Sequence, residues 1–422
     1  MGKLKLKSEF SRNVLTLMTG TTIAQAIPIA ISPILTRIYT PKDFGVLALF
    51  VAISAVLGSV ANGRYELAIM LPRKDEDAIN IFSLGIIITC FLSLLLLILV
   101  ILFNDYFIYV LKNKEIGFWL YFIPIAVFFA GLFNALNYFN NRIKKYEDLR
   151  NASILKSIVL AIVQLSVGVI KTGATGLISG SIISNMFANI KLLKNISKNQ
   201  NLTSKISKKK IIALSKKYSN FPKFSLPAVL LNNLSFYSIY IYISNIYAIT
   251  ILGFYSLVDK LLGIPTVLIG RSVGQVFFQQ ASDEVKKNEQ IVTIFLSTIK
   301  KLILIAIPIY GIIFFVSEFA FEIIFGKNWA IAGYYAKLLS FLYFARFITS
   351  PFTVIPYLID KVKIDFYFQS LLFFLTILTF VISYFLSLSI ESYLLFFSII
   401  IGSYYFIYTV ILFILIKKSK YE

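Results

Sequence analysis

Histidine is absent from this 422-residue sequence, and cysteine occurs only once, as Cys90. Without histidine the chain lacks the commonest metal ligand and the commonest side chain that changes protonation near neutral pH. A single cysteine cannot form a disulfide within the chain, and Cys90 lies in the apolar run Leu84–Ile101, where a packing role is expected. Charged residues are also scarce, at 14% of the chain, against about 25% in soluble domains. This composition excludes an ordinary soluble domain.

Motifs of enzyme chemistry are missing as well. The sequence has no GxxxxGK[ST] nucleotide-binding motif, no cluster of metal-ligand residue types and no nucleophile–base pair with a soluble site around it. We therefore expect no enzyme activity, no metal and no cofactor. Transport driven by such a chain would need an ion gradient or the downstream consumption of its cargo.

Long apolar runs are what the sequence has in abundance. Hydrophobic residues make up 58% of the chain, and the mean hydropathy is +0.82. Twelve runs have about 20 residues or more, the length that crosses a hydrocarbon core of roughly 30 Å. Because lipid offers no partner for unpaired backbone groups, all twelve runs are predicted to be helices. The fold class is therefore an all-α integral membrane protein with twelve transmembrane helices.

The basic residues are distributed unevenly over the loops. Of 41 Lys and Arg, 29 lie in the two tails and in one alternating set of loops, and only six lie in the other set. The positive-inside rule then places both termini in the cytoplasm. In a membrane protein this distribution accounts for the net charge of +21 without a nucleic-acid partner.

The longest loop, Lys191–Lys223, divides the chain into two six-span halves. We predict an N-terminal six-helix bundle over 1–196, a cytoplasmic basic linker over 197–223 and a C-terminal six-helix bundle over 224–422. The linker sequence SKKKIIALSKKYSNF fits either an amphipathic helix on the anionic inner leaflet or a solvated basic segment. The halves resemble each other, since Gly63-Arg64 recurs as Gly270-Arg271 shifted by one residue. Internal repeats of this kind are typical of transporters.

Charged residues inside the spans are the main candidates for function. Intramembrane charges face a bundle interior or a wet cavity. The acids within the spans are chiefly Glu66 and Asp259, which are possible coupling acids. Six basic residues remain within the spans, and they make the interior net positive: Arg64, Lys156, Lys260, Arg271, Lys337 and Arg346. A positive interior suits an anionic cargo, and arginine binds phosphate oxygens with a planar fork. We assign anion binding to Arg64, Arg271 and Arg346, with Lys260 assisting.

Helical geometry separates these charges further. Lys260 and Arg271 are eleven residues apart, which places them on one face of an unbroken helix. Lys156 lies near the cytoplasmic end of its span and Lys337 near the outer end of its span, so either lysine could snorkel to the headgroups. Two residues apart on a helix is a poor spacing for an ion pair, so Arg64 and Glu66 are not expected to pair along one helix.

Uncharged polar residues also lie within the spans. They could contact sugar hydroxyls or the lumen, or serve helix packing, as Gly176-x-x-x-Gly180 is expected to do. The sequence leaves both interpretations open for Thr22, Gln25, Asn232, Asn233 and Gln275.

Five stretches of the sequence resemble one known family over nearly the whole chain. They are ILTRIYTPKDFGVLALF, NGRYELAIMLP, GATGLISG, NFPKFSLPA and FGKNWAIAGYYAKLL. In matching order they resemble the Wzx-type flippases of lipid-linked oligosaccharides, in the multidrug/oligosaccharidyl-lipid/polysaccharide exporter superfamily. The related lipid II flippases generally carry fourteen spans, so twelve spans argue against that branch.

The resemblance implies a V-shaped, alternating-access transporter of two six-helix bundles with a cation-lined lumen. The implied function is to flip undecaprenyl-diphosphate-linked oligosaccharide repeat units to the outer face of the cell inner membrane, for O-antigen or capsule biosynthesis. The implied partners are the lipid-linked substrate, membrane lipids, and a polysaccharide polymerase with its chain-length machinery. A multidrug/cation antiporter of the same superfamily is the alternative, although it would need an acidic lumen. A membrane-embedded glycan polymerase is disfavoured, because no outside loop is long enough to carry a site.

Overall fold

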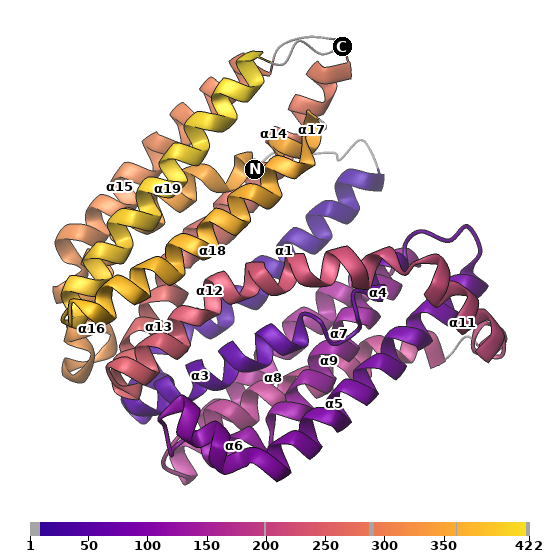
Figure 1. The fold of residues 1–422 in the computed structure, drawn as a ribbon, viewed down its shortest axis with the longest axis horizontal. Coiled ribbons are helices and arrows are strands. Elements are labelled where there is room, and N and C mark those ends of the chain that lie inside the picture. Colours follow the sequence, from indigo (N-terminus) through magenta and orange to yellow (C-terminus); the bar gives the residue numbers. More distant parts are fainter. Residues whose placement is uncertain (1–8, 198–199, 287–290, 360, 419–422) are drawn as a thin grey trace, which may run out of the picture. The chain divides into compact units, whose positions relative to one another are not determined.

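The structure is a computed structural model that describes residues 9–197, 200–286, 291–359 and 361–418. Every regular element in these residues is a helix (Figure 1). Twelve helical segments within them are long and apolar enough to cross a membrane. The prediction of an all-α, multi-pass membrane protein with twelve spans is confirmed.

The chain folds as two compact units, residues 1–245 and residues 246–422. The division follows helix α12, so the basic linker and the span after it belong to the first unit. The sequence places the division earlier, in the linker 197–223. The limits 1–196, 197–223 and 224–422 for two six-helix bundles and a basic linker remain a prediction.

The first unit is built around helix α7. This helix packs against α3, α5 and α9, while α8 packs against α1 and α9. In chain order the helices of this unit are α1 (Glu9–Ala30), α2 (Ser32–Ile38), α3 (Pro41–Gly58), α4 (Tyr65–Ala68), α5 (Asp75–Leu111), α6 (Gly117–Leu120), α7 (Ile123–Arg142), α8 (Tyr146–Ile170), α9 (Thr175–Ser197), α10 (Gln200–Thr203), α11 (Lys208–Lys217), η1 (Phe221–Ser225) and α12 (Leu226–Ile246).

The second unit has α16 at its centre. This helix packs against α13, α15 and α19, and α18 packs against α19. In chain order the helices of this unit are α13 (Ile249–Pro265), η2 (Thr266–Gly270), α14 (Arg271–Lys286), α15 (Val292–Phe325), η3 (Lys327–Trp329), α16 (Ala330–Thr349), η4 (Ser350–Phe352), α17 (Ile355–Leu358), α18 (Val362–Phe385) and α19 (Ile390–Lys418).

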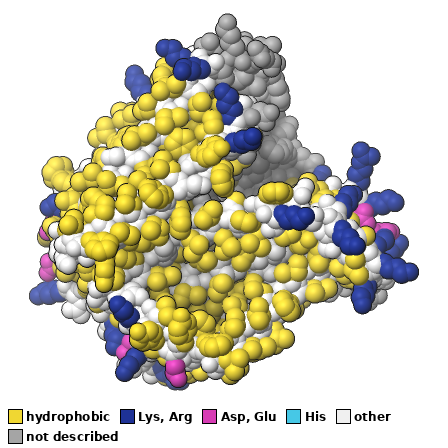
Figure 2. Space-filling model, in the orientation of Figure 1, with side chains coloured by type: hydrophobic (Ala, Val, Ile, Leu, Met, Phe, Trp, Pro, Cys, Tyr) yellow, Lys and Arg dark blue, Asp and Glu magenta, His cyan; other side chains and the backbone are white. Residues whose placement is uncertain are grey.

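Apolar side chains cover the outside of the long helices as well as the core. On α5, Phe91, Ile101 and Leu102 are exposed. In Figure 2, apolar side chains run along the helices of the first unit, and Lys and Arg gather at the end where α11 lies. Exposed apolar side chains over the length of a span are what hydrocarbon requires. Cys90, which the sequence predicts to be packed, is exposed on this α5 surface.

Two predicted spans are interrupted, and both interruptions carry an arginine. The sequence predicts one helix over Phe44–Met70, but α3 ends at Gly58, and α4 begins at Tyr65 after a series of turns. The sequence also predicts one helix over Gly253–Gln280, but α13 ends at Pro265 and the π-helix η2 follows it. Pro265 has no N–H to continue the α-helical hydrogen bonds, which explains the change at this point.

Helix α11 forms from the basic linker and packs onto the first unit. Leu214 is buried in the hydrophobic core of this unit, with Ile211 packed against that core. Lys205 and Lys210 bind the Glu76 carboxylate at 2.8 and 2.9 Å. The helix is amphipathic, as one interpretation of the sequence predicts, but these apolar residues face protein rather than lipid.

Glycine allows close helix contacts in both units. A Cβ at Gly180 of α9 would lie 2.7 Å from the Cγ atom of Gln164 on α8, so the predicted small-residue packing of this motif is confirmed. In the second unit, a Cβ at Gly333 of α16 would lie 2.5 Å from the backbone oxygen of Ser317 on α15. Backbone atoms cannot rotate away as a flexible side chain can, so α15 and α16 contact each other closely only because residue 333 is glycine.

We expect Gly333→Ala to lower the free energy of unfolding by about 1–3 kcal/mol, because α15 and α16 would have to separate. The matched control is Gly311→Ala on α15, where an added Cβ meets nothing within 4 Å. That change should be neutral or stabilise the helix by about 0.5–1 kcal/mol. Thermal unfolding of the purified variants in detergent measures both effects, and equal melting temperatures would contradict the packing argument.

Candidate functional site

Arg64 lies in a turn with left-handed backbone conformation. Gly63 has φ of 61° and Arg64 has φ of 64°, immediately before α4. Left-handed φ is uncommon for a residue with a Cβ, so the surrounding contacts must hold the arginine in place. The turn therefore sets the direction of the Arg64 guanidinium. A continuous helix through this position would point the side chain elsewhere.

The Arg64 side chain binds two partners within the first unit. Its Nη1 atom lies 3.0 Å from Oε1 of Glu66, and its Nε atom donates a hydrogen bond of 3.2 Å to Oγ of Ser225. Glu66 is 3% exposed, and its Oε2 atom has no hydrogen-bond partner. Arg64 is 20% exposed, so the guanidinium remains accessible while the carboxylate is enclosed.

The Arg64–Glu66 pair corrects the sequence prediction that these residues would not pair. That prediction depends on both residues belonging to one α-helix, where a spacing of two points side chains apart. Arg64 instead precedes α4 and has left-handed φ, which brings its side chain back over Glu66. Burial raises the pKa of the Glu66 carboxyl, and the nearby Arg64 charge opposes this rise.

Neighbouring elements hold the turn from several sides. Arg142, at the end of α7, donates from Nη1 to the carbonyl oxygen of Ile69 at 3.0 Å and from Nη2 to Oδ1 of Asp75 at 2.8 Å. The Tyr65 hydroxyl donates to the carbonyl oxygen of Ser215 on α11 at 2.9 Å. The basic linker thus has a structural function at the site, because α11 covers the segment that positions Arg64.

Helix α7 presents a polar face next to this turn. Tyr138 lies close enough to Arg64 and Glu66 to interact electrostatically with both. Three amides, Asn134, Asn137 and Asn141, are half-exposed and share an arc of about 100° with Tyr138. The opposite face of the helix is buried. This face was not predicted from the sequence, although amides at i, i+3 and i+7 in the stretch NALNYFNN indicate it.

Lys156 also points into the first unit. Its Nζ atom lies 5.0 Å from the centre of the Phe133 ring of α7. The exposed apolar residues Ile158 and Ile162 lie on the opposite side of α8. The structure therefore does not support the snorkelling predicted for Lys156. A lysine at the centre of a span costs about 2.5–3.5 kcal/mol on insertion scales, and a desolvated cation–π contact returns about 2 kcal/mol.

A second group of charges lies within the second unit, where Tyr343 is buried and Asp259 and Arg346 are half-exposed. The Tyr343 hydroxyl of α16 donates a hydrogen bond to Oδ1 of Asp259 on α13. Arg346, one turn further along α16, interacts electrostatically with Asp259, Tyr343 and Tyr405. Arg346 and Arg64 are both half-exposed and each has an acidic neighbour, and Arg346 also has tyrosines around it.

Lys260 and Arg271 do not share a continuous α-helix as predicted. Lys260 is exposed on α13, and Arg271 begins α14 after the π-helix η2. A π-helix turns less per residue than an α-helix, so the eleven-residue spacing no longer places both on one face. The side chain of Arg271 lies outside the described part of the structure.

The predicted polar contacts lie on three helices. Asn233 donates from Nδ2 to the carbonyl oxygen of Val229 at 3.0 Å, within its own helix. The other candidates are exposed or half-exposed and are Thr22 and Gln25 on α1, Asn232 on α12 and Gln275 on α14. Within the described residues, no group of three or more His, Cys, Asp and Glu could hold a metal ion.

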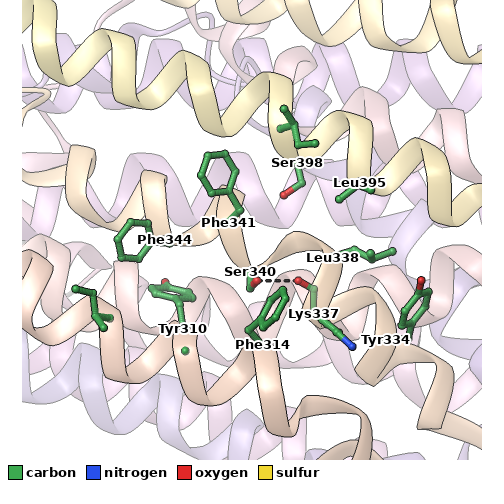
Figure 3. Close-up of a pocket in the computed structure, with 13 residues that line it drawn as sticks. Tyr310, Phe314, Tyr334, Lys337, Leu338, Ser340, Phe341, Phe344, Leu395 and Ser398 are labelled. Atoms are coloured by element: carbon green, nitrogen blue, oxygen red, sulfur yellow. Dashed lines mark hydrogen bonds between the residues drawn. The ribbon is translucent and has the colours of Figure 1, made fainter.

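The second unit also contains an apolar pocket of about 570 Å³ between α15, α16 and α19 (Figure 3). Phe314, Phe341 and Phe344 line it, and Lys337 lies at one side. The Lys337 ammonium lies 3.0 Å from Oε1 of Glu318, so its charge is paired. This pocket lacks the free positive charge that the predicted anion site requires.

Solved structures with the same fold are transporters and flippases. The lipid II flippase MurJ, in an inward closed conformation, has a TM-score of 0.72 at 14% identity, with 96% of this chain and 88% of that chain covered. The MATE multidrug transporter DinF-BH has a TM-score of 0.66 at 13% identity, with 100% and 98% covered. An inward-facing multidrug resistance MATE family transporter of the MOP superfamily has a TM-score of 0.63 at 12% identity, with 95% and 96% covered. The fold is that of the MOP-superfamily membrane transporters.

The sequence match defines the family within this fold. The model of the family described as "Polysaccharide biosynthesis protein" matches residues 34–332, which is more than half of the chain. The chain belongs to this family. No curated protein sequence matches it. The resemblance to flippases and exporters of the superfamily, drawn from the sequence motifs, is confirmed.

We expect Arg64→Ala to lower the free energy of unfolding by about 1–3 kcal/mol at neutral pH, because it leaves the buried Glu66 carboxylate without its partner. The pKa of Glu66 is already raised, and removing Arg64 raises it further. A group with a raised pKa in the folded state contributes its stability at low pH and loses it as the pH rises through that pKa. The deficit of Arg64→Ala relative to wild type should therefore grow as the pH rises from about 4.5 to 8.

Thermal unfolding in detergent across this pH range measures the effect. The double variant Arg64→Ala/Glu66→Gln is the control, because it has no carboxyl at position 66 to titrate. Its stability difference from wild type should vary less with pH. A deficit of Arg64→Ala that stays constant over the whole range would contradict the pairing.

Proposed function

We propose that this protein flips undecaprenyl-diphosphate-linked oligosaccharide repeat units from the cytoplasmic to the outer face of the cell inner membrane, by alternating access, for O-antigen or capsule biosynthesis. The observation that carries the proposal is the accessible Arg64 guanidinium beside the polar face of α7. Membership of the polysaccharide biosynthesis family supports this class of cargo. The distribution of basic loops supports cytoplasmic termini.

Arg64 suits the diphosphate because its remaining N–H groups can bind phosphate oxygens. One guanidinium nitrogen pairs with Glu66 and another with Ser225, and the exposed part of the fork is left for the cargo. We propose that Arg271 contributes a second guanidinium, with Lys260 assisting. Arg346, placed beside Asp259, would act on the cargo only if that interaction were released.

Two acids, the buried Glu66 and the half-exposed Asp259, are proposed to couple transport to ion movement. Glu66 has an unsatisfied oxygen beside Arg64, and Asp259 accepts a hydrogen bond from Tyr343. Protonation of either acid would change the charge next to an arginine. An antiporter of cationic drugs is less well supported, since two half-exposed charges within the first unit, Arg64 and Lys156, are positive. The proposed partners are membrane lipids, a polysaccharide polymerase and its chain-length machinery.

We expect Arg64→Ala and Arg271→Ala each to abolish surface glycan in cells. Arg64→Ala/Glu66→Gln, which leaves no unpaired carboxylate, should do the same and should lose binding of undecaprenyl diphosphate after purification. Arg73→Ala is the matched control, since Arg73 is an exposed arginine nine residues further along. Immunoblots of membranes verify insertion of every variant. Normal glycan export by both single variants would refute the proposed role.

A further inference from the structure

Lys156 is an intramembrane cation with no role in the proposed function so far. Its contact with the Phe133 ring does not neutralise its charge. Among the described residues no carboxylate forms an ion pair with it, in contrast to Lys337, whose ammonium binds Glu318. A half-buried positive charge without a carboxylate partner is suited to bind an anion.

The helix faces direct Lys156 toward the interior of its unit. On α8 the exposed apolar positions Ile158, Ile162 and Val169 lie on one side. Lys156 lies two residues before Ile158, which places it about 160° away around the helix. It follows the first residue of α8, Tyr146, by ten residues and is only partly exposed. The ammonium is therefore well inside the bundle and turned away from lipid.

Helix α7 connects this lysine to the Arg64 turn. Tyr138 of α7 interacts with Arg64 and Glu66, and Phe133 of the same helix lies under Lys156. Five residues of α-helix correspond to an axial offset of about 7.5 Å. The two cations therefore approach α7 at different depths, which makes them two separate positions for an anion.

The surface of α7 between these depths carries amides. Asn134, Asn137 and Asn141 are half-exposed on the face that also carries Tyr138. Asn137 lies one helical turn after Phe133, so Lys156 borders the edge of this amide face. An amide offers both a donor and an acceptor, which matches the hydroxyl groups of sugars.

We propose that Lys156 is a second binding position for the cargo diphosphate, and that the amide face of α7 binds the sugars that accompany it. The inference rests on the proposed function and adds a step to it. Arg64 binds the diphosphate first through its planar fork. Lys156 then receives it as a point charge, which places few geometric demands on the ligand and so favours release.

The test compares binding with translocation. Lys156→Met removes the charge at similar volume, Lys156→Arg retains it, and Lys171→Met removes an exposed lysine just after the end of the same helix. Native mass spectrometry measures binding of undecaprenyl diphosphate to each purified protein. Proteoliposomes measure translocation of a fluorescent undecaprenyl-diphosphate-linked saccharide. We expect Lys156→Met to bind within twofold of wild type and to translocate at least tenfold more slowly, with Lys156→Arg and Lys171→Met close to wild type.

A second variant tests the amide face independently of the lysine. Asn137→Leu should slow translocation of the saccharide-linked carrier at least fivefold, and it should not slow translocation of undecaprenyl diphosphate without sugar. This arm tests the sugar assignment whatever the stability of Lys156→Met. Equal slowing of both carriers would overturn the sugar assignment.

The remaining outcomes separate the inference from the proposed function. If wild type translocates the carrier and Lys156→Met does so at the same rate, the second position is refuted while the flippase function stands. If Lys156→Met instead melts at a lower temperature and loses binding, Lys156 is structural and the inference is refuted. If folded wild type neither binds nor translocates the carrier, the proposed function itself fails.

Discussion

A charge enclosed in a membrane protein must have a partner or an access to water, and the first unit is organised around one such charge. The Arg64–Glu66 pair satisfies only part of this requirement, because one carboxylate oxygen has no partner and one side of the guanidinium is accessible. Three features hold the Arg64–Glu66 pair in this geometry: the left-handed turn, the contact of Arg142 with Ile69 and the packing of α11 over the segment. Arg64 remains an accessible cation because its neighbours position it without neutralising it fully.

The basic residues within the spans have different neighbours in the two units. In the first unit, Arg64 is accessible and Lys156 contacts an aromatic ring. In the second unit, Arg346 interacts with Asp259 and with tyrosines, and Lys337 binds Glu318. An arginine therefore lies beside an acid in each unit. The lysines differ, because Lys337 is ion-paired with Glu318 whereas Lys156 forms no ion pair among the described residues.

Both interrupted spans place an arginine directly after a glycine. Gly63-Arg64 follows the end of α3, and Gly270-Arg271 lies where the π-helix η2 ends and α14 begins. In membrane proteins, irregular backbone is tolerated where it is buried in protein or lines a cavity. The same dipeptide therefore lies at both interruptions, as the internal repeat seen in the sequence predicts.

Local composition is sufficient to define the class of protein, whereas the use of its charges depends on the folded chain. Three local features of the sequence indicate the family: twelve apolar runs, the asymmetry of the basic loops and the order of motifs such as NGRYELAIMLP. Each of them can be recognised without knowing the fold. Apolar residues on both sides of residues 59–64 suggest one continuous span over Phe44–Met70, so hydropathy does not reveal that the helix ends at Gly58 and that Arg64 turns back onto Glu66. The sequence likewise allows Lys156 to reach either the lipid headgroups or Phe133. Only the packing of α8 on its neighbours decides between the two. Pairing depends on backbone dihedral angles and on contacts between distant segments, which no local stretch of sequence specifies.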